Sequence, residues 1–308
     1  MSRKPRRAVV RLSVLFAGLL CLLLGPRVGA AQTTSFAPGD IVVSLMNGQV
    51  QWWHANGSFN KVLQGSIPGT SEGMRFDASG NLYVTHWCAD PSCRTGNTVE
   101  HFNTMGVSQG AFQSGYWCNP HAIAFDATGK AYVGQADCTG DILELAPGGA
   151  PITFAETPEN RGAFWIDLAA DNCTVFYTSE GPDVKRFNVC TNAQLTDFNV
   201  APLPGGEGQD LRVLPDGGLI VSSYRVIVRL DGTGNVVQTY SVPSEPNFWA
   251  GLALVGDGTF WAVNYYSSSV YRFNLATGAV LSSINTGTPN YTAVAVAVSG
   301  VTGGSCPK

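Results

Sequence analysis

Hydrophobic and polar residues alternate in short runs along most of the chain. The stretch "FDASGNLYV" (76–84) joins two such runs through a small polar turn that ends at Gly80, and "FDATGKAYV" (125–133) repeats it 49 residues later. Alternation with a period of two buries one face of a β-strand. The pattern therefore predicts β-hairpins that pack through one face.

The hairpin recurs at a nearly constant period. Successive turn residues are 49, 43, 45, 41 and 42 residues apart, at Gly80, Gly129, Asn172, Gly217, Gly258 and, in a weaker copy, Gly300. Two further strand-like runs follow the hairpins, as in 183–189 and 193–200. Four strands in every 40 to 50 residues are typical of a β-propeller blade.

The two ends of the repeat complement each other. The last first strand, 293–298, has no partners after it, whereas the runs at 40–45, 48–55 and 60–65 have no first strand before them. Joining these halves into one blade removes the open sheet edges. We therefore expect an all-β fold, a six-bladed β-propeller over 39–300 that is closed by strands from both termini.

The N-terminus reads as an export signal. A basic segment precedes a short apolar segment (13–24) and a small-residue cleavage site at 28–30. The apolar segment is shorter than the roughly 20 residues that span a bilayer. The prediction is a signal peptide at 1–30, tails at 31–38 and 301–308, a secreted or periplasmic location, and no membrane span after cleavage.

The charge of the exported part excludes one class of partner. Residues 1–30 contain six of the 18 basic residues and none of the 22 acidic ones, so the remainder has 12 basic and 22 acidic residues and a net charge of −10. Nucleic-acid binding needs clustered Lys and Arg, which are absent after the signal. We expect no nucleic-acid partner, and we expect a monomer.

Three segments carry a resemblance to a known family. "GMRFDASGNLYVTH", "AIAFDATGKAYVGQ" and "LALVGDGTFWAVN" resemble six-bladed propellers with NHL repeats and the senescence marker protein–gluconolactonase family, over about 40–306. The family implies a divalent cation held by the Glu of a Glu-Gly pair and by Asn or Asp residues of later blades. Here Glu72 is retained, but the later positions are Phe164 and Gln209, with Asp210 one residue further on, and calcium needs about six oxygen ligands. The resemblance implies a calcium site at Glu72, Gln209 and Asp210.

In a propeller, each inner strand begins and each second strand ends on the same face, which we call the upper face. These positions and their loops are aromatic and polar here, as in many small-molecule sites. The predicted ligand-binding residues are His86, Trp87, Trp117, Gln135, Trp165, Glu180, Trp249, Asn264 and Tyr265. The alternative is that the aromatic residues fill the channel and the blade interfaces.

The function that follows is recognition of a small molecule, a glycan or a protein. The alternative is a metal-assisted hydrolase or lactonase with Glu72 and His121 as catalytic residues. His121, in "NPHAIAFD", also resembles a position in propellers similar to streptogramin lyase, although the further acid and histidine of that enzyme are not apparent. Common catalytic motifs such as GxSxG and HExxH are absent. The sequence leaves enzyme, binding protein and interaction scaffold open.

Seven of the eight cysteines remain after export, where disulfides persist. The blade register pairs six of them. The predicted bridges are Cys88–Cys93, Cys118–Cys138 and Cys173–Cys190. Cys306 is left over, and we expect a free thiol or an intermolecular link there.

Overall fold

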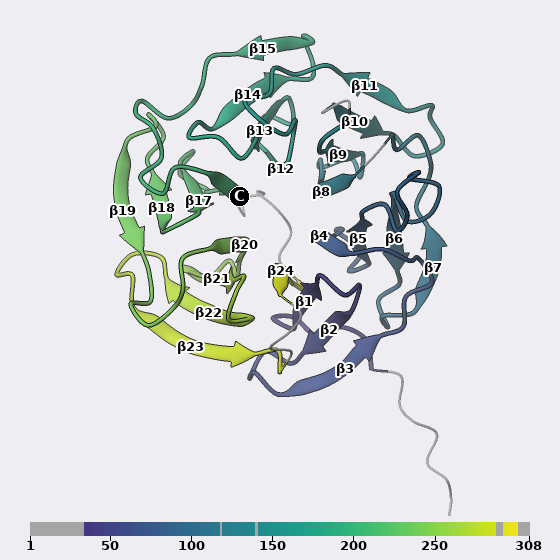
Figure 1. The fold of residues 1–308 in the computed structure, drawn as a ribbon, viewed down its shortest axis with the longest axis horizontal. Helices are drawn as coiled ribbons and strands as arrows, with labels where there is room; N and C mark the ends of the chain where they lie inside the picture. Colours follow the sequence, from purple (N-terminus) through teal and green to yellow (C-terminus); the bar gives the residue numbers. More distant parts are fainter. Residues whose placement is uncertain (1–33, 118, 139–140, 288–291, 301–308) are drawn as a thin grey trace, which may run out of the picture. The chain divides into compact units, whose positions relative to one another are not determined.

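The computed structural model describes residues 34–117, 119–138, 141–287 and 292–300, and these contain 24 β-strands and no helix. The strands form six four-stranded antiparallel sheets. Figure 1 shows the sheets arranged in a ring, each with one strand near the centre and one at the periphery. The predicted all-β, six-bladed architecture is confirmed. The predicted signal peptide lies outside the described residues.

We number the blades along the chain and name their strands from the inner to the outer one. Blade 1 contains β24 (Ala293–Val298), β1 (Ile41–Leu45), β2 (Val50–Trp53) and β3 (Phe59–Leu63); blade 2 contains β4 (Ser71–Phe76), β5 (Leu82–His86), β6 (Thr98–Phe102) and β7 (Ser108–Ala111); blade 3 contains β8 (Pro120–Phe125), β9 (Ala131–Gln135), β10 (Ile142–Leu145) and β11 (Ile152–Phe154). Blade 4 contains β12 (Trp165–Leu168), β13 (Thr174–Thr178), β14 (Lys185–Asn188) and β15 (Ala193–Leu195); blade 5 contains β16 (Gly208–Val213), β17 (Leu219–Ser223), β18 (Ile227–Leu230) and β19 (Val236–Tyr240); blade 6 contains β20 (Trp249–Leu254), β21 (Thr259–Asn264), β22 (Ser269–Asn274) and β23 (Val280–Asn285).

Blade 1 closes the ring with strands from both ends of the repeat. β24 pairs antiparallel with β1, so that Val298 lies opposite Ile41 and Val296 opposite Val43. Phe36, in the predicted N-terminal tail, packs on the same blade with its ring centroid 4.4 Å from that of Trp52. The predicted closure is confirmed.

The turns of the inner hairpins explain the repeated glycine. In five blades the predicted turn residue has a left-handed backbone, with φ between +56° and +84°, at Gly80, Gly129, Asn172, Gly217 and Gly258. Glycine adopts this conformation without a Cβ clash, and asparagine tolerates it better than most residues. The turn positions read from the sequence are therefore the true ones.

Buried hydroxyl groups connect neighbouring blades. Each lies on a second strand and donates to a backbone carbonyl at the start of the next inner strand. The pairs are Ser44 to Glu72 (2.7 Å), Thr85 to His121 (2.9 Å) and Thr178 to Gln209 (2.5 Å), and Ser222 donates to Ala250 in the same way. These contacts fix the start of four inner strands, where the predicted site lies.

Two of the predicted disulfides are present. The Cα atoms of Cys88 and Cys93 are 4.7 Å apart, and those of Cys173 and Cys190 are 5.3 Å apart. Cys118 and Cys306 lie outside the described residues, so the Cys118–Cys138 bridge and the state of Cys306 stay predictions. The two bridges are compatible with an extracellular or periplasmic location.

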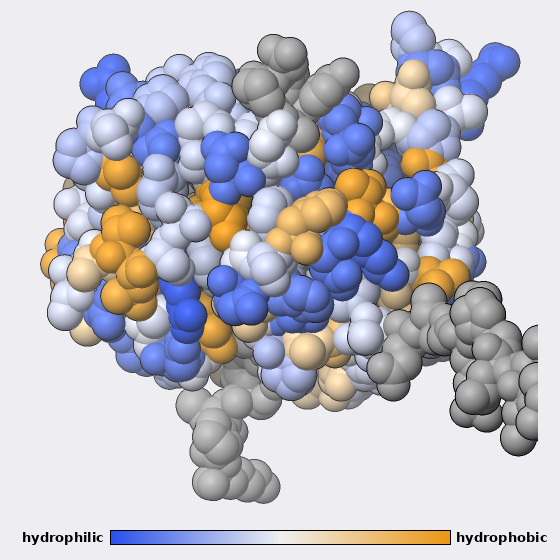
Figure 2. All heavy atoms as spheres, turned by 90° about the horizontal axis from the view of Figure 1, so that it is seen from below, coloured by the Kyte–Doolittle hydropathy of each residue, from blue (hydrophilic) through white to orange (hydrophobic). Residues whose placement is uncertain are grey.

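The outer wall of the ring carries scattered apolar side chains. Figure 2, seen from the side of blades 1 and 6, shows small hydrophobic patches separated by hydrophilic residues. Phe59 on β3 and Leu281 on β23 are among the exposed apolar residues. Scattered residues of this kind are normal on a soluble surface. Within the described residues, no segment has the length and apolar character of a membrane-spanning helix.

Candidate functional site

β-Bulges shape the start of four inner strands. The register with the second strand shifts there, between Ser71 and Met74, Pro120 and Ala122, Gly208 and Leu211, and Trp249 and Leu252. A bulge re-aims side chains and is frequent beside functional sites. In blades 2, 3 and 5 it contains Glu72, His121 and Gln209, which are all buried. These three residues therefore occupy equivalent positions around the upper end of the channel.

Gly73 brings the first two of them together. A Cβ atom at this position would lie only 2.3 Å from the carbonyl oxygen of His121. Because glycine has no Cβ, β4 can approach β8 closely. As a result, Oε2 of Glu72 lies 3.8 Å from Nδ1 of His121. The Glu-Gly pair is thus explained by packing.

His121 is held by aromatic residues. The indole Nε1 of Trp87 donates to Nδ1 of His121 at 3.1 Å, and the imidazole stacks on Phe164 with 3.8 Å between centroids. Trp165 contacts the ring edge-on at 4.7 Å. Because Nδ1 accepts a hydrogen bond, the neutral ring carries its proton on Nε2. That Nε2 has no hydrogen-bond partner among the described residues.

Burial controls the charge of this pair. It raises the pKa of Glu72 to about 7, an effect that the neighbouring Thr70 hydroxyl and the positive charge of Arg161 partly offset. It lowers the pKa of His121 well below the usual range, and Arg161 lowers it further. Near neutral pH the imidazole is therefore uncharged, and Glu72 is present in both protonation states.

Arg161 covers the aromatic residues from the loop that precedes β12. Its guanidinium lies 4.8 Å from the ring centroid of Phe164 and 5.1 Å from that of Trp87. It donates to both oxygens of Asp137, at 2.7 and 2.9 Å, and to Glu180 at 3.2 Å. Two carboxylates thus surround one guanidinium, so this edge of the site is acidic overall.

Ser179 fixes the loop that carries Arg161. Its Oγ accepts the backbone N–H groups of Glu159, Asn160 and Arg161 at 3.0 to 3.1 Å. A hydroxyl oxygen that accepts three backbone donors satisfies groups that the loop itself leaves unpaired. The position of Arg161 therefore depends on a residue of the neighbouring second strand.

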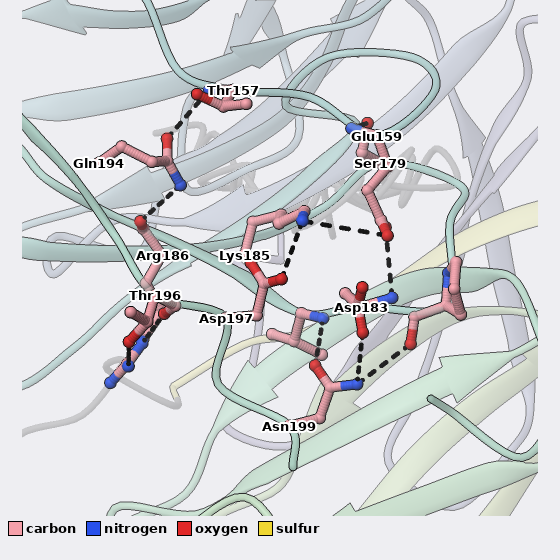
Figure 3. A network of polar contacts seen from close by, with 12 residues as sticks. Thr157, Glu159, Ser179, Asp183, Lys185, Arg186, Gln194, Thr196, Asp197 and Asn199 are labelled. Carbon is pink, nitrogen blue, oxygen red and sulfur yellow. Dashed lines mark hydrogen bonds and ion pairs between the residues drawn. The ribbon is translucent and has the colours of Figure 1, made fainter. Parts of the chain in front are cut away.

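A wider polar network supports the same loop. Figure 3 shows the carboxylate of Glu159 near Lys185, which also binds Asp197, and near Asp183, which Asn199 contacts. The backbone N–H of Asp183 donates to Glu159 at 3.2 Å, and Nζ of Lys185 lies 3.0 Å from Asp197. This network joins the Arg161 loop to blade 4.

Both partners of Arg161 have an uncommon backbone. Asp137 has φ of +66° and Glu180 has φ of +52°, in the left-handed region that residues with a Cβ rarely adopt. Such conformations cost about 1–3 kcal/mol and cluster at functional sites. The strain here is compatible with a site built around Arg161.

The predicted residues at the ends of second strands have protein partners. Nε2 of His86 lies 3.2 Å from Oε2 of Glu100, and Gln135 accepts the backbone N–H of Trp117 at 2.7 Å. Asn264 donates to a backbone carbonyl of the preceding loop at 2.7 Å. All three side chains are buried. Gln135 and Asn264 hold loops in place, whereas His86 contacts strand β6, and a contact with ligand stays a prediction.

The predicted tryptophans differ in exposure. Trp165 and Trp249 are buried, and Trp249 packs about 6 Å from Tyr271 and Phe273, whereas Trp117 is 67 % exposed. Trp87 contacts both His121 and Arg161, and Tyr265 belongs to a separate aromatic group on blades 5 and 6. The structure thus brings Trp87 and Trp165 to the Glu72–His121 pair and separates Trp249 from it.

The predicted calcium ligands fit a hard cation poorly. Asp210 accepts the backbone N–H of Leu252 at 2.6 Å and that of Leu211 at 2.7 Å, and it pairs with Arg212. The unpaired atom of Gln209 is its amide nitrogen, a hydrogen-bond donor that cannot coordinate a cation. No three His, Cys, Asp or Glu side chains of the described ranges form a group that could hold a metal ion. The calcium site stays a prediction.

Sequence patterns did not indicate Arg161 or Asp137. Both lie in loops, where no hydrophobic period sets their orientation. The available signal was an isolated arginine in "PENRGAFW", three residues before the start position Phe164. It became informative only when Ser179 and Asp137 were seen to hold it.

Comparisons with known proteins define the fold. The chain matches no known protein family and no curated protein. Solved structures do match. A chain of a nidogen/laminin complex has a TM-score of 0.69 at 10 % identity, with 84 % of this chain and 97 % of that chain covered. A protein of unknown function from Bacteroides caccae has a TM-score of 0.66 at 12 % identity (86 % and 100 % covered), and a streptogramin B lyase has a TM-score of 0.56 at 15 % identity (83 % and 76 % covered). At such identities the likeness establishes a six-bladed β-propeller and nothing narrower; the NHL and gluconolactonase resemblance stays a prediction.

Proposed function

We propose that this propeller binds a small, neutral, hydroxyl-bearing molecule at the upper end of its channel. The observation that carries the proposal is a set of unpaired polar atoms at equivalent start positions: Oε1 of Glu72, Nε2 of His121 and Nε2 of Gln209. Buried polar groups are nearly always hydrogen-bonded, and each unpaired one costs about 1–3 kcal/mol. A bound ligand would satisfy them.

The chemistry of these atoms favours a hydroxyl group. His121 presents an N–H donor, Gln209 presents an amide donor, and ionised Glu72 presents an acceptor. A hydroxyl group both donates and accepts hydrogen bonds, so it can bridge the Glu72 acceptor and one of the two N–H donors. Phe164 and Trp87 supply apolar ring faces beside these groups. Hydroxylated rings, such as those of monosaccharides and hydroxylactones, combine the two properties.

Charge at the rim disfavours anions. Arg161 already binds Asp137 and Glu180, so an anionic ligand would meet an acidic edge. The buried position of the unpaired atoms also favours a small molecule over a folded protein, because a protein surface cannot easily reach them. Export, as read from the N-terminus, would bring such a site to extracellular or periplasmic solutes.

A binding panel tests the proposal. Monosaccharides, polyols and lactones are screened by thermal shift, and the best compound is titrated by calorimetry. We expect His121→Phe, which keeps a ring and removes the Nε2 donor, to weaken binding at least about tenfold, the effect of one lost hydrogen bond. Phe59→Ala, at an exposed aromatic residue of the outer strand β3, serves as the control. Equal binding to wild type and His121→Phe, or no binding in the panel, would contradict the proposal.

Hydrolysis or lactone opening at the same site is the second candidate. Its specific support is a carboxyl whose pKa is about 7 beside a neutral imidazole, which suits general acid–base catalysis. Turnover of the panel lactones should then fall at least about 100-fold in Glu72→Gln. Repeating the assay with a chelator tests the metal-assisted form. Turnover that survives Glu72→Gln would remove this candidate.

A further inference from the structure

Four aromatic rings gather on the upper face of blades 5 and 6. Tyr224 follows β17, Phe248 precedes β20, and Tyr265 and Tyr266 follow β21. The centroid of Phe248 lies 5.1 Å from that of Tyr224, 4.6 Å from that of Tyr265 and 5.6 Å from that of Tyr266. We call these four residues the tyrosine platform.

The platform meets solvent, unlike most other aromatic residues of these blades. Tyr266 is 52 % exposed, and Tyr224, Phe248 and Tyr265 are half-buried. Trp249, the next residue after Phe248, is buried in the core. Phe248 is fixed in the loop because the backbone N–H of Tyr265 donates to its carbonyl at 2.9 Å. The loops therefore hold apolar ring faces at the surface.

Carboxylates border the platform. The backbone N–H of Tyr224 donates to the carbonyl of Glu207 at 3.0 Å, which places the exposed Glu207 at its edge. A hydrogen bond with Tyr266 is the main cause of a raised pKa of Tyr224, and the Glu207 charge adds to it. Burial is the main cause of the raised pKa of Glu180, and Glu207 adds there too. The positive charge of Arg225 acts on the pKa of Tyr224 in the opposite direction, as the smallest of these effects.

We propose that the tyrosine platform binds a small organic cation, and a quaternary ammonium ion in particular. The faces of aromatic rings attract such cations. N-methyl groups are weakly hydrated, so they lose little hydration when they pack on a ring. Glu207 supplies the opposite charge at the edge, and the net charge of −10 outside the predicted signal peptide favours a cation over an anion. A neutral glycan would use the rings but not the acidic edge.

The packing of the rings sets the geometry of binding. Centroids 4.6 to 5.6 Å apart belong to rings in mutual contact, so no ion fits between them. The cation would therefore rest on the outer ring faces, with Tyr266 as the most exposed contact. This site is separate from the Glu72–His121 pair, and it does not depend on the function proposed for that pair.

A pair of matched probes tests the proposal. Choline and 3,3-dimethylbutan-1-ol have nearly the same shape, but only choline is charged. In an NMR titration of the purified chain, we expect choline to bind at least tenfold more tightly than the alcohol. Equal affinities would show that the rings act only as an apolar surface, and they would overturn the proposal.

Variants place the binding on the platform. Tyr266→Ala and Glu207→Gln should each weaken choline binding about fivefold or more, whereas Tyr266→Phe, which keeps the ring, should retain it. Phe59→Ala, at an exposed aromatic residue of β3, and His121→Phe should leave it unchanged. Choline binding that persists in both Tyr266→Ala and Glu207→Gln, with the fold intact by circular dichroism, would exclude the platform.

Discussion

The two ends of the central channel use the same inner strands in opposite ways. Toward the lower end, Arg75 on β4 reaches Asp167 on β12 at 2.7 Å, across the intervening blade 3. Asp167 also accepts the backbone N–H of Val213 on β16 at 2.9 Å. At the upper end, Glu72 and His121 leave polar atoms unpaired.

The difference separates structural from functional polar groups. A buried charge is tolerated when an opposite charge and hydrogen bonds satisfy it. Asp167 has both, because it pairs with Arg75 and accepts the backbone N–H of Val213. Unpaired groups in the same channel reduce stability, so a chain that keeps them has another use for them. We infer that the lower end holds the ring together and that the upper end is kept open for a ligand.

Removing a buried, paired carboxylate should lower the free energy of unfolding more than any other change proposed here. Asp210→Ala leaves the buried guanidinium of Arg212 without its partner and deprives the backbone N–H groups of Leu211 and Leu252 of an acceptor. Breaking a buried ion pair in this way costs about 3–5 kcal/mol. Urea denaturation measures this loss.

A surface ion pair provides the matched control. Arg229 and Asp216 are 2.7 Å apart but partly exposed, and pairs of this kind contribute about 0–1 kcal/mol. Asp216→Ala should therefore lower the unfolding free energy much less than Asp210→Ala. Similar losses in the two variants would mean that burial of the channel charges does not matter.

Replacing Glu72 should sharpen the contrast through pH. The raised pKa means that Glu72 holds its proton more tightly in the folded state than in the unfolded state. This tighter binding stabilises the fold fully below about pH 4.5, and the stabilisation is lost as the pH rises through about 7. Glu72→Gln stays neutral at every pH. We expect the variant to match wild type near pH 4.5 and to be more stable at pH 8, by on the order of 3 kcal/mol.

The measurement is a series of urea denaturations between pH 4.5 and pH 8. Comparing the variant with wild type at each pH cancels the titration of all other groups that the substitution leaves unchanged. Parallel stability curves for the two proteins would contradict the assignment of Glu72 as a buried, unpaired carboxyl.

A substitution that loosens the loop carrying Arg161 should have the smallest effect on the free energy of unfolding. Ser179→Ala removes the hydroxyl that accepts the backbone N–H groups of Glu159 and Asn160, whereas the N–H of Arg161 keeps the Ser179 carbonyl as a second acceptor at 3.2 Å. Water can also reach part of this loop, so we expect a loss of about 1 kcal/mol. Affinity for the best compound of the panel should fall as well, because Arg161 is no longer held over Phe164. Ser58→Ala, at an exposed turn, is the control, and affinity equal to wild type in Ser179→Ala would show that the loop position is irrelevant to binding.

The repeat pattern was sufficient to predict the ring. Turn residues such as Gly80 and Asn172 mark where the backbone must be left-handed, and strand alternation fixes which positions face the core. The orphan strand 293–298 then required closure with the N-terminal part. Each of these signals is local, so the sequence carries it directly.

The site was predictable only in outline. The sequence identified Glu72, His121 and Gln209 as candidate site residues, but it could not distinguish the buried Trp249 from the half-buried Phe248 beside it. That difference depends on how two loops pack. The position of Arg161 likewise depends on Ser179, which is 18 residues away in the sequence. Long-range contacts of this kind have no periodic signature.

Gln209→Met tests the central claim most directly. The substitution keeps the size of the side chain and removes the unpaired buried donor, while the backbone carbonyl that binds Thr178 is unaffected. Thermal and urea denaturation are measured with and without the best compound of the panel. The account predicts that the ligand-free variant is more stable than wild type, by about 1 kcal/mol or more, and that the compound stabilises it less. A variant that is less stable than wild type without the compound, or that the compound stabilises equally, would show that the amide serves the fold and would contradict the account.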